Sequence, residues 1–284
     1  MKVTVVIPAY HEKGNVSELS VRLQRVFVAM GVQFEIFFVI QGDDGSLEAL
    51  DELSKHEIPS LRWAYFPSPL GVGAAFCYGF QNISPDCTHV LTLDADLNHQ
   101  PEELPLFVTE VRKHEVDIVV GSRYVRGGSQ FEGLPFWKFA SSRLVNDFLS
   151  YTTDLKISDK TSGYRLMRRE VVDCLVNASF SRGYDFYLEF MWRAHRAGFN
   201  IVEVPIEFKA RKTGRSKMPK IRTFLSYLFL LLRTYADLVR KRRPGSGQDI
   251  DHGNAASNVL VQKQNSEYDN LSLETCGSSV ALDE

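Results

Sequence analysis

The first hundred or so residues alternate short apolar runs with longer segments whose apolar residues recur at helical spacing, and a longer, mixed segment follows. The apolar runs predict buried strands, and the helical spacing predicts amphipathic helices between them. The expected strands are 2–9, 34–40, 61–67, 88–94, 116–124 and 200–208, and the expected helices are 16–30, 47–56, 71–81, 136–151, 170–177 and 184–197. This alternation predicts an α/β fold with a mainly parallel central sheet covered on both faces. Ligands of such sheets bind beyond the carboxyl ends of the strands.

The pattern changes towards the C-terminus. Residues 221–243 are apolar in their first half and basic at their end. They predict a helix that either docks on the fold or lies at a membrane interface, with Arg240, Lys241, Arg242 and Arg243 towards anionic headgroups. Its apolar run is shorter than the roughly 20 residues that a spanning helix needs. Residues 244–284 are polar and rich in Gly and Ser, which predicts a disordered tail and leaves 1–220 as the main folded domain.

Composition narrows the class of protein only slightly. The chain has 284 residues with 44% hydrophobic and 24% charged residues, which is ordinary for a soluble globular protein. A net charge of -2 does not favour nucleic acid as a partner. The first ten residues are apolar for too short a run to be a signal peptide. The four cysteines have neither metal-ligand spacing nor the pattern of a disulfide framework, so a reducing, cytosolic setting is expected.

Two aspartates, Asp94 and Asp96, directly follow the apolar run of the fourth expected strand. In an extended segment residues i and i+2 point the same way, so their carboxylates are expected to converge. Hard cations such as Mg²⁺ or Mn²⁺ take oxygen ligands, often one or two carboxylates together with substrate phosphates. The pair therefore predicts either a cation that clamps a diphosphate or, less specifically, a polar loop.

Six stretches of the chain occur in the order typical of one enzyme family. They are VTVVIPAYHE, LDADLNHQPEELP, VVGSRYVRGG, DKTSGYRLMRREV, SRGYDFYLEF and VPIEFKARKTGRSK. Together they resemble the polyprenyl-phosphate glycosyltransferases, specifically the dolichol-phosphate mannosyltransferase branch of glycosyltransferase family 2. The resemblance covers roughly residues 2 to 235 and implies the GT-A (Rossmann-like) fold of an inverting enzyme.

For the donor, the resemblance implies a nucleotide-sugar site and a metal site that share residues. The nucleotide-sugar site would comprise Pro8, Tyr10, Glu12, Gln41, Gly71, Asp94 and Asp96. The metal, Mg²⁺ or Mn²⁺, would be held by Asp94, Asp96 and Asn98, of which Asn98 replaces the glutamine common in the family. The catalytic residues implied are Asp96, Arg123 and Arg211.

The base-reading segment departs from the family pattern. Ile40 and Gln41 stand where the family usually has aspartates after its second strand, and Asp44, Gly45 and Ser46 match the motif that follows. The amide of Gln41 can still hydrogen-bond a base edge, although a carboxylate would be the better acceptor for guanine. The donor therefore stays open between GDP-mannose, which leads, and UDP-glucose or a UDP-N-acetylhexosamine.

For the acceptor, the resemblance implies a phosphate site made of Arg123, Lys138, Ser142, Arg211 and Lys217. Arg offers a planar fork that matches phosphate oxygens. The basic loop with Arg211, Ser216 and Lys217 is expected to fold over the joined phosphates as a lid. Such a run can also be no more than a solvated basic face.

The expected activity is transfer of a hexose to a polyprenyl (dolichyl) phosphate at the cytoplasmic face of a membrane, with peripheral attachment. The expected partners are thus a nucleotide sugar, a polyprenyl phosphate and a membrane surface, and no nucleic acid. A second hypothesis, of another class, is a non-catalytic relative that keeps the fold as a binding or regulatory subunit. Donor comparison with purified protein distinguishes the two.

Overall fold

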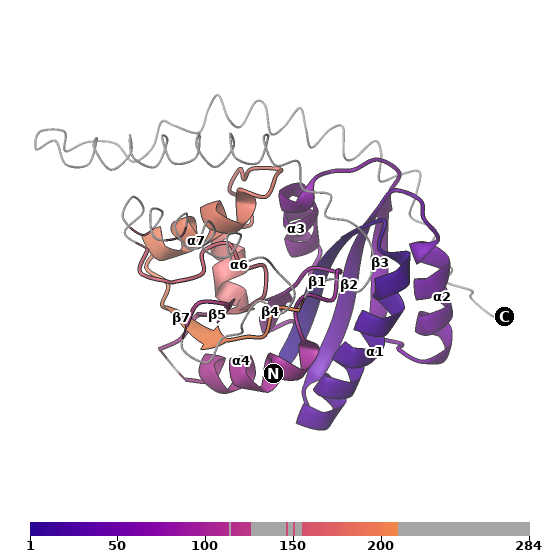
Figure 1. Cartoon of the computed structure of the whole chain (residues 1–284), viewed down its shortest axis with the longest axis horizontal. Coiled ribbons are helices and arrows are strands. Elements are labelled where there is room, and N and C mark those ends of the chain that lie inside the picture. The colour runs from indigo at the N-terminus through magenta and orange to yellow at the C-terminus, as the bar shows by residue number, and fades with distance from the viewer. Residues whose placement is uncertain (114, 126–145, 147–149, 151–154, 210–284) are drawn as a thin grey trace, which may run out of the picture. The chain divides into compact units, whose positions relative to one another are not determined.

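The computed structural model describes residues 1–113, 115–125, 146, 150 and 155–209. A seven-stranded sheet in the order β3-β2-β1-β4-β6-β5-β7 runs through them (Figure 1). Its strands are β1 (Lys2–Tyr10), β2 (Gln33–Gln41), β3 (Leu61–Phe66), β4 (His89–Thr92), β5 (Ile118–Ser122), β6 (Arg165–Arg168) and β7 (Ile201–Pro205). β1 pairs in parallel with β2 on one side and β4 on the other.

β6 is the one reversed strand among those described. It pairs antiparallel with both β4 and β5, so these two neighbours still run in the same direction. The sheet is therefore mainly parallel, which confirms the predicted fold class. The sequence pattern did not predict β6, because the strand has only four residues and begins and ends with arginine.

The helices follow the predicted pattern with one addition. They are α1 (Lys13–Met30), α2 (Ser46–His56), α3 (Val72–Gln81), η1 (Pro101–Glu103), α4 (Leu104–Val111), α6 (Arg169–Leu175) and α7 (Phe186–Arg196). The additional element is the 3-10 turn η1 with α4. The predicted helix 136–151 lies outside the described residues except for Asn146 and Ser150, which are helical.

The pleat of the strands divides the core into layers on the two faces of the sheet. Val5 and Ile7 of β1 pack in a cluster with residues of α1, α2 and α4, whereas Val6 packs with residues of α3, α6 and α7. α3 lies so close to β1 that a side-chain carbon on Gly79 would stand 2.2 Å from Val6 Cγ1. Both faces of the sheet are thus covered, as predicted.

The carboxyl ends of the parallel strands bring four chain segments to one edge of the sheet. β1 ends at Tyr10, β2 at Gln41, β4 at Thr92 and β5 at Ser122. The in-register pairing of Tyr10 with Gln41 shows how closely the first two of these ends match. Most of the predicted donor residues, the predicted metal residues and Arg123 lie at or just beyond these ends, whereas Pro8 lies within β1 and Gly71 follows β3.

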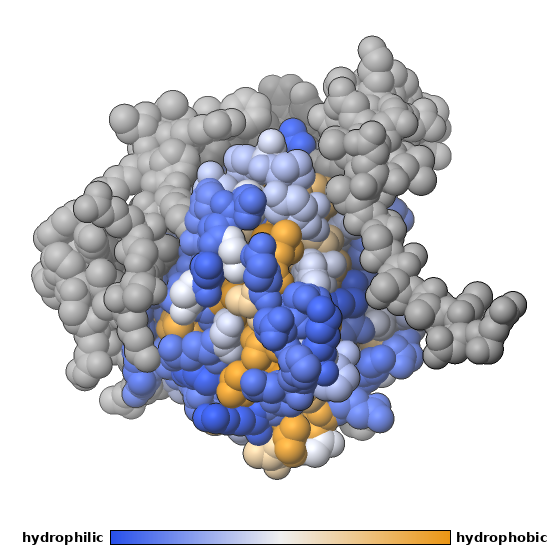
Figure 2. Space-filling view, turned by 90° about the vertical axis from the view of Figure 1, so that its right-hand side faces the viewer, coloured by the Kyte–Doolittle hydropathy of each residue, from blue (hydrophilic) through white to orange (hydrophobic). Residues whose placement is uncertain are grey.

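The side on which α2 lies is mainly hydrophilic, with small separate apolar areas (Figure 2). Among the described residues, no helix combines the length and the apolarity that crossing a membrane requires. The predicted interfacial helix 221–243, the predicted tail 244–284 and the domain boundary at 220 lie outside the described residues.

Candidate active site

The loop after β4 carries the acidic pair but is not an extension of the strand. β4 ends at Thr92, and Ala95 and Asp96 already form a turn in which Leu97 has a φ of 61°. The alternation of side chains expected for a strand therefore does not continue to Asp96. Instead, Asp94 and Asp96 face different partners.

Asp96 and Asn98 form a buried pair with unused acceptor capacity. Asp96 accepts hydrogen bonds from Asn98 N at 3.1 Å and from Asn98 Nδ2 at 3.0 Å. Only 6% of Asp96 and 7% of Asn98 is exposed, and Asn98 Oδ1 is buried without a hydrogen-bond partner among the described residues. Native proteins rarely leave such an oxygen unsatisfied. A carboxylate and an amide oxygen are ligands that Mg²⁺ and Mn²⁺ prefer, so the residues fit the predicted metal.

Asp94 is held from a distant part of the chain. The Tyr187 hydroxyl donates a hydrogen bond of 2.6 Å to Asp94 Oδ1. A side-chain carbon on Gly163 would lie 3.2 Å from Asp94 Oδ2 and 2.9 Å from Tyr187 Cε1. No group of three or more His, Cys, Asp or Glu side chains in the described part of the chain is arranged to hold a metal. A cation here would depend on the two aspartates, Asn98 and its substrate.

The first predicted nucleotide residues, Pro8 and Tyr10, lie in β1, and the segment that follows them is held by the loop after β2. Glu12 precedes α1 and accepts a hydrogen bond from Asn15 Nδ2 at 2.6 Å. Asp44 accepts hydrogen bonds from Lys13 N and from Ser46. Burial opposes ionisation of Asp44, but these hydrogen bonds outweigh it and lower its pKa. The predicted Asp44–Ser46 motif thus ties the segment after Tyr10 to β2.

Gln41 lies in the predicted base site and also supports the turn at the start of α3 that contains Gly71 and Gly73, called the glycine-rich turn below. It is 3% exposed, and its Oε1 accepts hydrogen bonds from Leu70 N at 2.8 Å and Gly71 N at 3.2 Å. The oxygen is therefore already used by the protein backbone. Contact with a base, which remains a prediction, would have to be made through the amide nitrogen.

The glycines at 71 and 73 are required by protein packing. Gly71 has a φ of 94°, and a side-chain carbon on it would stand 2.4 Å from Arg182 O. The equivalent carbon on Gly73 would stand 2.1 Å from Ser181 O, and Gly73 N donates to Arg182 O. The segment before α7 therefore lies directly on the turn that the sequence assigned to the nucleotide.

Arg123 follows β5 and is held by a buried carboxylate. Its Nε and Nη2 donate to Asp159 at 2.7 and 2.8 Å, and Asp159 is fully buried. Burial opposes ionisation of Asp159, but the Arg123 charge and hydrogen bonds outweigh it and hold its pKa below the ordinary range. The Asp159 and Ser158 amides in turn donate to Glu203 of β7. The sequence alone did not identify this ion pair.

The segment after β7 contacts both the metal loop and Arg123. Phe208 forms a bridge with His99, Lys209 N donates to Asn98 O at 3.1 Å, and the Arg123 guanidinium lies 5.2 Å from the Phe208 ring centre. This segment leads into the predicted basic lid. Four predicted acceptor residues lie outside the described residues: Lys138, Ser142, Arg211 and Lys217.

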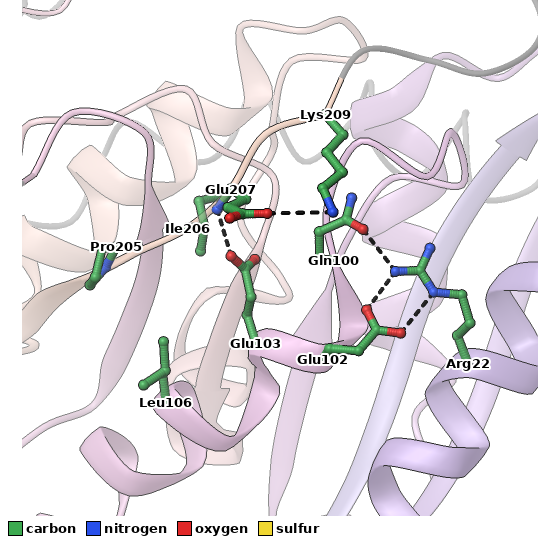
Figure 3. Close-up of a pocket in the computed structure, with 9 residues that line it drawn as sticks. All are labelled: Arg22, Gln100, Glu102, Glu103, Leu106, Pro205, Ile206, Glu207 and Lys209. Carbon is green, nitrogen blue, oxygen red and sulfur yellow. Dashed lines mark hydrogen bonds and ion pairs between the residues drawn. The ribbon is translucent and has the colours of Figure 1, made fainter. Parts of the chain in front are cut away.

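A cavity of about 510 Å³ lies between α1, η1 and the segment after β7 (Figure 3). The lining residues are Arg22, Gln100, Glu102, Glu103, Leu106, Pro205, Ile206, Glu207 and Lys209. None of them is a predicted site residue. Glu103 Oε1 accepts the Glu207 amide at 2.5 Å, while its Oε2 is buried with no hydrogen-bond partner in the described ranges. Burial, with the nearby Glu207 carboxylate, raises the pKa of Glu103 to about 7.

Replacing Glu103 by glutamine is expected to raise the melting temperature at pH 8 by a few degrees and to have little effect near pH 4. Because the pKa is raised from 4.5 to about 7, the folded chain binds this proton more tightly than the unfolded chain. The free energy of unfolding therefore decreases as the pH rises between these two pKa values. The glutamine variant does not undergo this decrease, because glutamine does not ionise. Thermal unfolding of both proteins across this pH range is the measurement, and a difference that does not change with pH would contradict the assignment.

The sheet is mainly parallel, is covered by helices on both faces and has an acidic pair beyond its fourth strand. This arrangement is typical of the GT-A-type glycosyltransferases. The chain belongs to glycosyl transferase family 2, whose model matches residues 4–176. It is accordingly a glycosyltransferase, as the sequence motifs predicted.

Two relatives are similar to this chain over most of its length. Polyprenol monophosphomannose synthase of Mycolicibacterium smegmatis is 36% identical over 217 residues, which cover 75% of this chain and 80% of that protein. Dolichol-phosphate mannosyltransferase of Pyrococcus furiosus is 32% identical over 232 residues, which cover 80% of this chain but 62% of that protein. The resemblance stated from the sequence is thereby confirmed.

Solved structures of lower identity share the fold. Glucosyl-3-phosphoglycerate synthase from Mycobacterium tuberculosis, in complex with Mn²⁺, UDP and phosphoglyceric acid, superimposes with a TM-score of 0.58 at 19% identity. The match covers 87% of this chain and 80% of that one. At this identity the comparison supports the GT-A-like fold alone.

Proposed function

We propose that this glycosyltransferase moves a mannosyl group from GDP-mannose to a polyprenyl phosphate and inverts the anomeric carbon. The observation that carries the proposal is the edge of the sheet that holds the buried Asp96–Asn98 pair, Asp94 and Arg123. It offers oxygen ligands for a cation and a guanidinium for phosphate within one site. The names of both sequence relatives support this donor sugar and this class of acceptor.

Some residues of the site would bind the donor, and others would bind the acceptor phosphate. Asp94, Asp96 and Asn98 would hold a divalent cation, which when bound neutralises charge on the diphosphate. Tyr10 and Gln41, at neighbouring strand ends, would border the nucleotide. Arg123 would receive the acceptor phosphate, and the predicted Arg211 loop would close over it.

The acceptor needs no general base in this mechanism. A phosphate monoester is largely ionised at neutral pH, since its second pKa is about 6. Catalysis would then rest on holding an acceptor oxygen in line with the anomeric carbon and on stabilising the charge of the leaving group. Asp94, Asp96 and Asp159 of the described site already accept hydrogen bonds, which supports a mechanism that uses no carboxylate as a base.

A lipid acceptor also requires contact with a membrane surface. The predicted helix 221–243, with its basic end, would provide this contact through anionic headgroups. A UDP-sugar donor is the second candidate, because Gln41 replaces a carboxylate in the predicted base site. A non-catalytic subunit is the alternative of another class.

The donor is tested by glycolipid formation with purified protein, Mn²⁺ and a short polyprenyl phosphate. GDP-mannose, UDP-glucose and UDP-N-acetylglucosamine are compared, with EDTA as the control for metal dependence. Transfer from GDP-mannose that EDTA abolishes is the expected result. Transfer from a UDP-sugar alone would replace the donor, and absence of both transfer and nucleotide binding would favour the non-catalytic alternative.

A further inference from the structure

The hydroxyl of Tyr187 makes a hydrogen bond with Asp94 across 93 positions of the sequence. Its length of 2.6 Å is typical of a hydroxyl that donates to a charged carboxylate. Tyr187 is 5% exposed, so its hydroxyl is largely shielded from solvent. The hydroxyl therefore acts as a donor to Asp94.

The ring of Tyr187 is fixed by its neighbours. It lies edge-on to Phe76 of α3 at 5.8 Å between ring centres, and the Arg165 guanidinium lies 5.6 Å from its centre. Phe186, next to it in α7, stacks on Phe76 at 5.5 Å. With this packing the hydroxyl has little freedom, so it can determine the orientation of Asp94.

Both oxygens of Asp94 lie close to the place that a side chain on Gly163 would take. A side-chain carbon at this position would stand 3.2 Å from Asp94 Oδ2, 3.4 Å from Asp94 Oδ1 and 2.9 Å from Tyr187 Cε1. Gly163 has no positive φ, so space rather than backbone conformation is what favours glycine here. Tyr187 and Gly163 together restrict the orientation of the half-buried Asp94 carboxylate.

The part of the chain that holds Asp94 through Tyr187 also contacts the glycine-rich turn. The segment that precedes α7 contacts Gly71 and Gly73 through its backbone carbonyls. The start of α7 and the segment before it therefore contact both the predicted metal and nucleotide-sugar residue Asp94 and the predicted nucleotide-sugar residue Gly71. A shift of α7 would change both parts of the donor site together.

We propose that Tyr187 is a positioning residue of the donor site, which acts by orienting Asp94 towards the nucleotide diphosphate and its cation. The inference rests on the proposed function, because it gives Asp94 a role in donor binding. Without the hydroxyl, Asp94 Oδ1 would lose this donor and face the apolar edge of a phenyl ring. Loss of a hydrogen bond to a charged oxygen is unfavourable, so the carboxylate would reorient.

The test uses Tyr187→Phe in the full chain, which removes the hydroxyl and keeps the ring. Tyr164→Phe is the matched control, because Tyr164 is also buried and its hydroxyl donates to a backbone carbonyl, Gln100 O, at 3.2 Å. Gly163→Ala is a second variant that displaces the same pair from the other side. Nucleotide affinity with and without Mn²⁺ is measured by calorimetry, and donor and acceptor KM values are measured by transfer.

We expect Tyr187→Phe to weaken Mn²⁺-dependent nucleotide binding and to raise the donor KM roughly tenfold. A change of this size corresponds to the loss of one hydrogen bond to a charged group. Gly163→Ala should change the same two quantities, while the acceptor KM stays near that of the wild type in both. The control should keep both KM values. Unchanged donor binding in Tyr187→Phe, or an equal loss in the control and in both KM values, would overturn the inference. A wild-type chain that neither binds nucleotide nor transfers sugar would instead refute the proposed function.

Discussion

Replacing Asp96 by asparagine is expected to reduce metal-dependent transfer by at least roughly a hundredfold while the chain stays folded. Asparagine has the same size and keeps an oxygen that can accept the Asn98 amide, so the turn after β4 has a partner. The variant lacks the charge that a divalent cation needs from its few protein ligands. Because Asp96 is 6% exposed, water does not readily take the place of that ligand.

Two measurements separate the metal from the fold in this variant. Calorimetric titration with Mn²⁺ in the presence of nucleotide reports the cation directly, and thermal unfolding reports the fold. Asp86→Asn is the matched control, since Asp86 is an exposed acid paired with Lys2 at the amino edge of the sheet. It should leave transfer unchanged. If Asp96→Asn binds Mn²⁺ and transfers sugar as the wild type does, Asp96 is not a metal ligand.

The fold was predictable because most strands and helices here carry strong periodic patterns. β1 and β2 are almost wholly buried, and buried parallel strands read as continuous apolar runs. β6 lacked such a signal, since its ends are Arg165 and Arg168 and its position between β4 and β5 depends on pairing across the chain. Local pattern cannot reveal a strand whose burial comes from its neighbours.

The position of the candidate residues in the fold was predictable only where motifs lie at strand ends. Asp94, Asp96 and Arg123 lie beyond the carboxyl ends of β4 and β5, and their roles stay predictions. Their partners were not predictable, because Tyr187 and Asp159 come from segments that meet these residues only after folding. Gly71 shows a related difference: the resemblance placed it in the nucleotide-sugar site, and its missing side chain also makes room for Arg182 O.

Replacing Arg123 by methionine is expected to destabilise the chain by about 3–5 kcal/mol, because it leaves a buried carboxylate without its partner. Asp159 is fully buried and accepts two hydrogen bonds from the Arg123 side chain. Thermal and urea unfolding measure the loss. Lys55→Ala, which breaks an exposed ion pair with Asp51, is the control and should leave the unfolding midpoint unchanged.

A double variant then separates the two roles of Arg123. In Arg123→Met with Asp159→Leu, no buried charge is left unpaired, and such replacements recover most or all of the lost stability. Transfer should nevertheless stay low, with a raised KM for the polyprenyl phosphate, because the guanidinium that is proposed to bind its phosphate is still absent. Recovery of transfer together with stability would show that Arg123 serves the fold alone. The acceptor phosphate would then have to depend on the predicted Lys138, Ser142, Arg211 and Lys217.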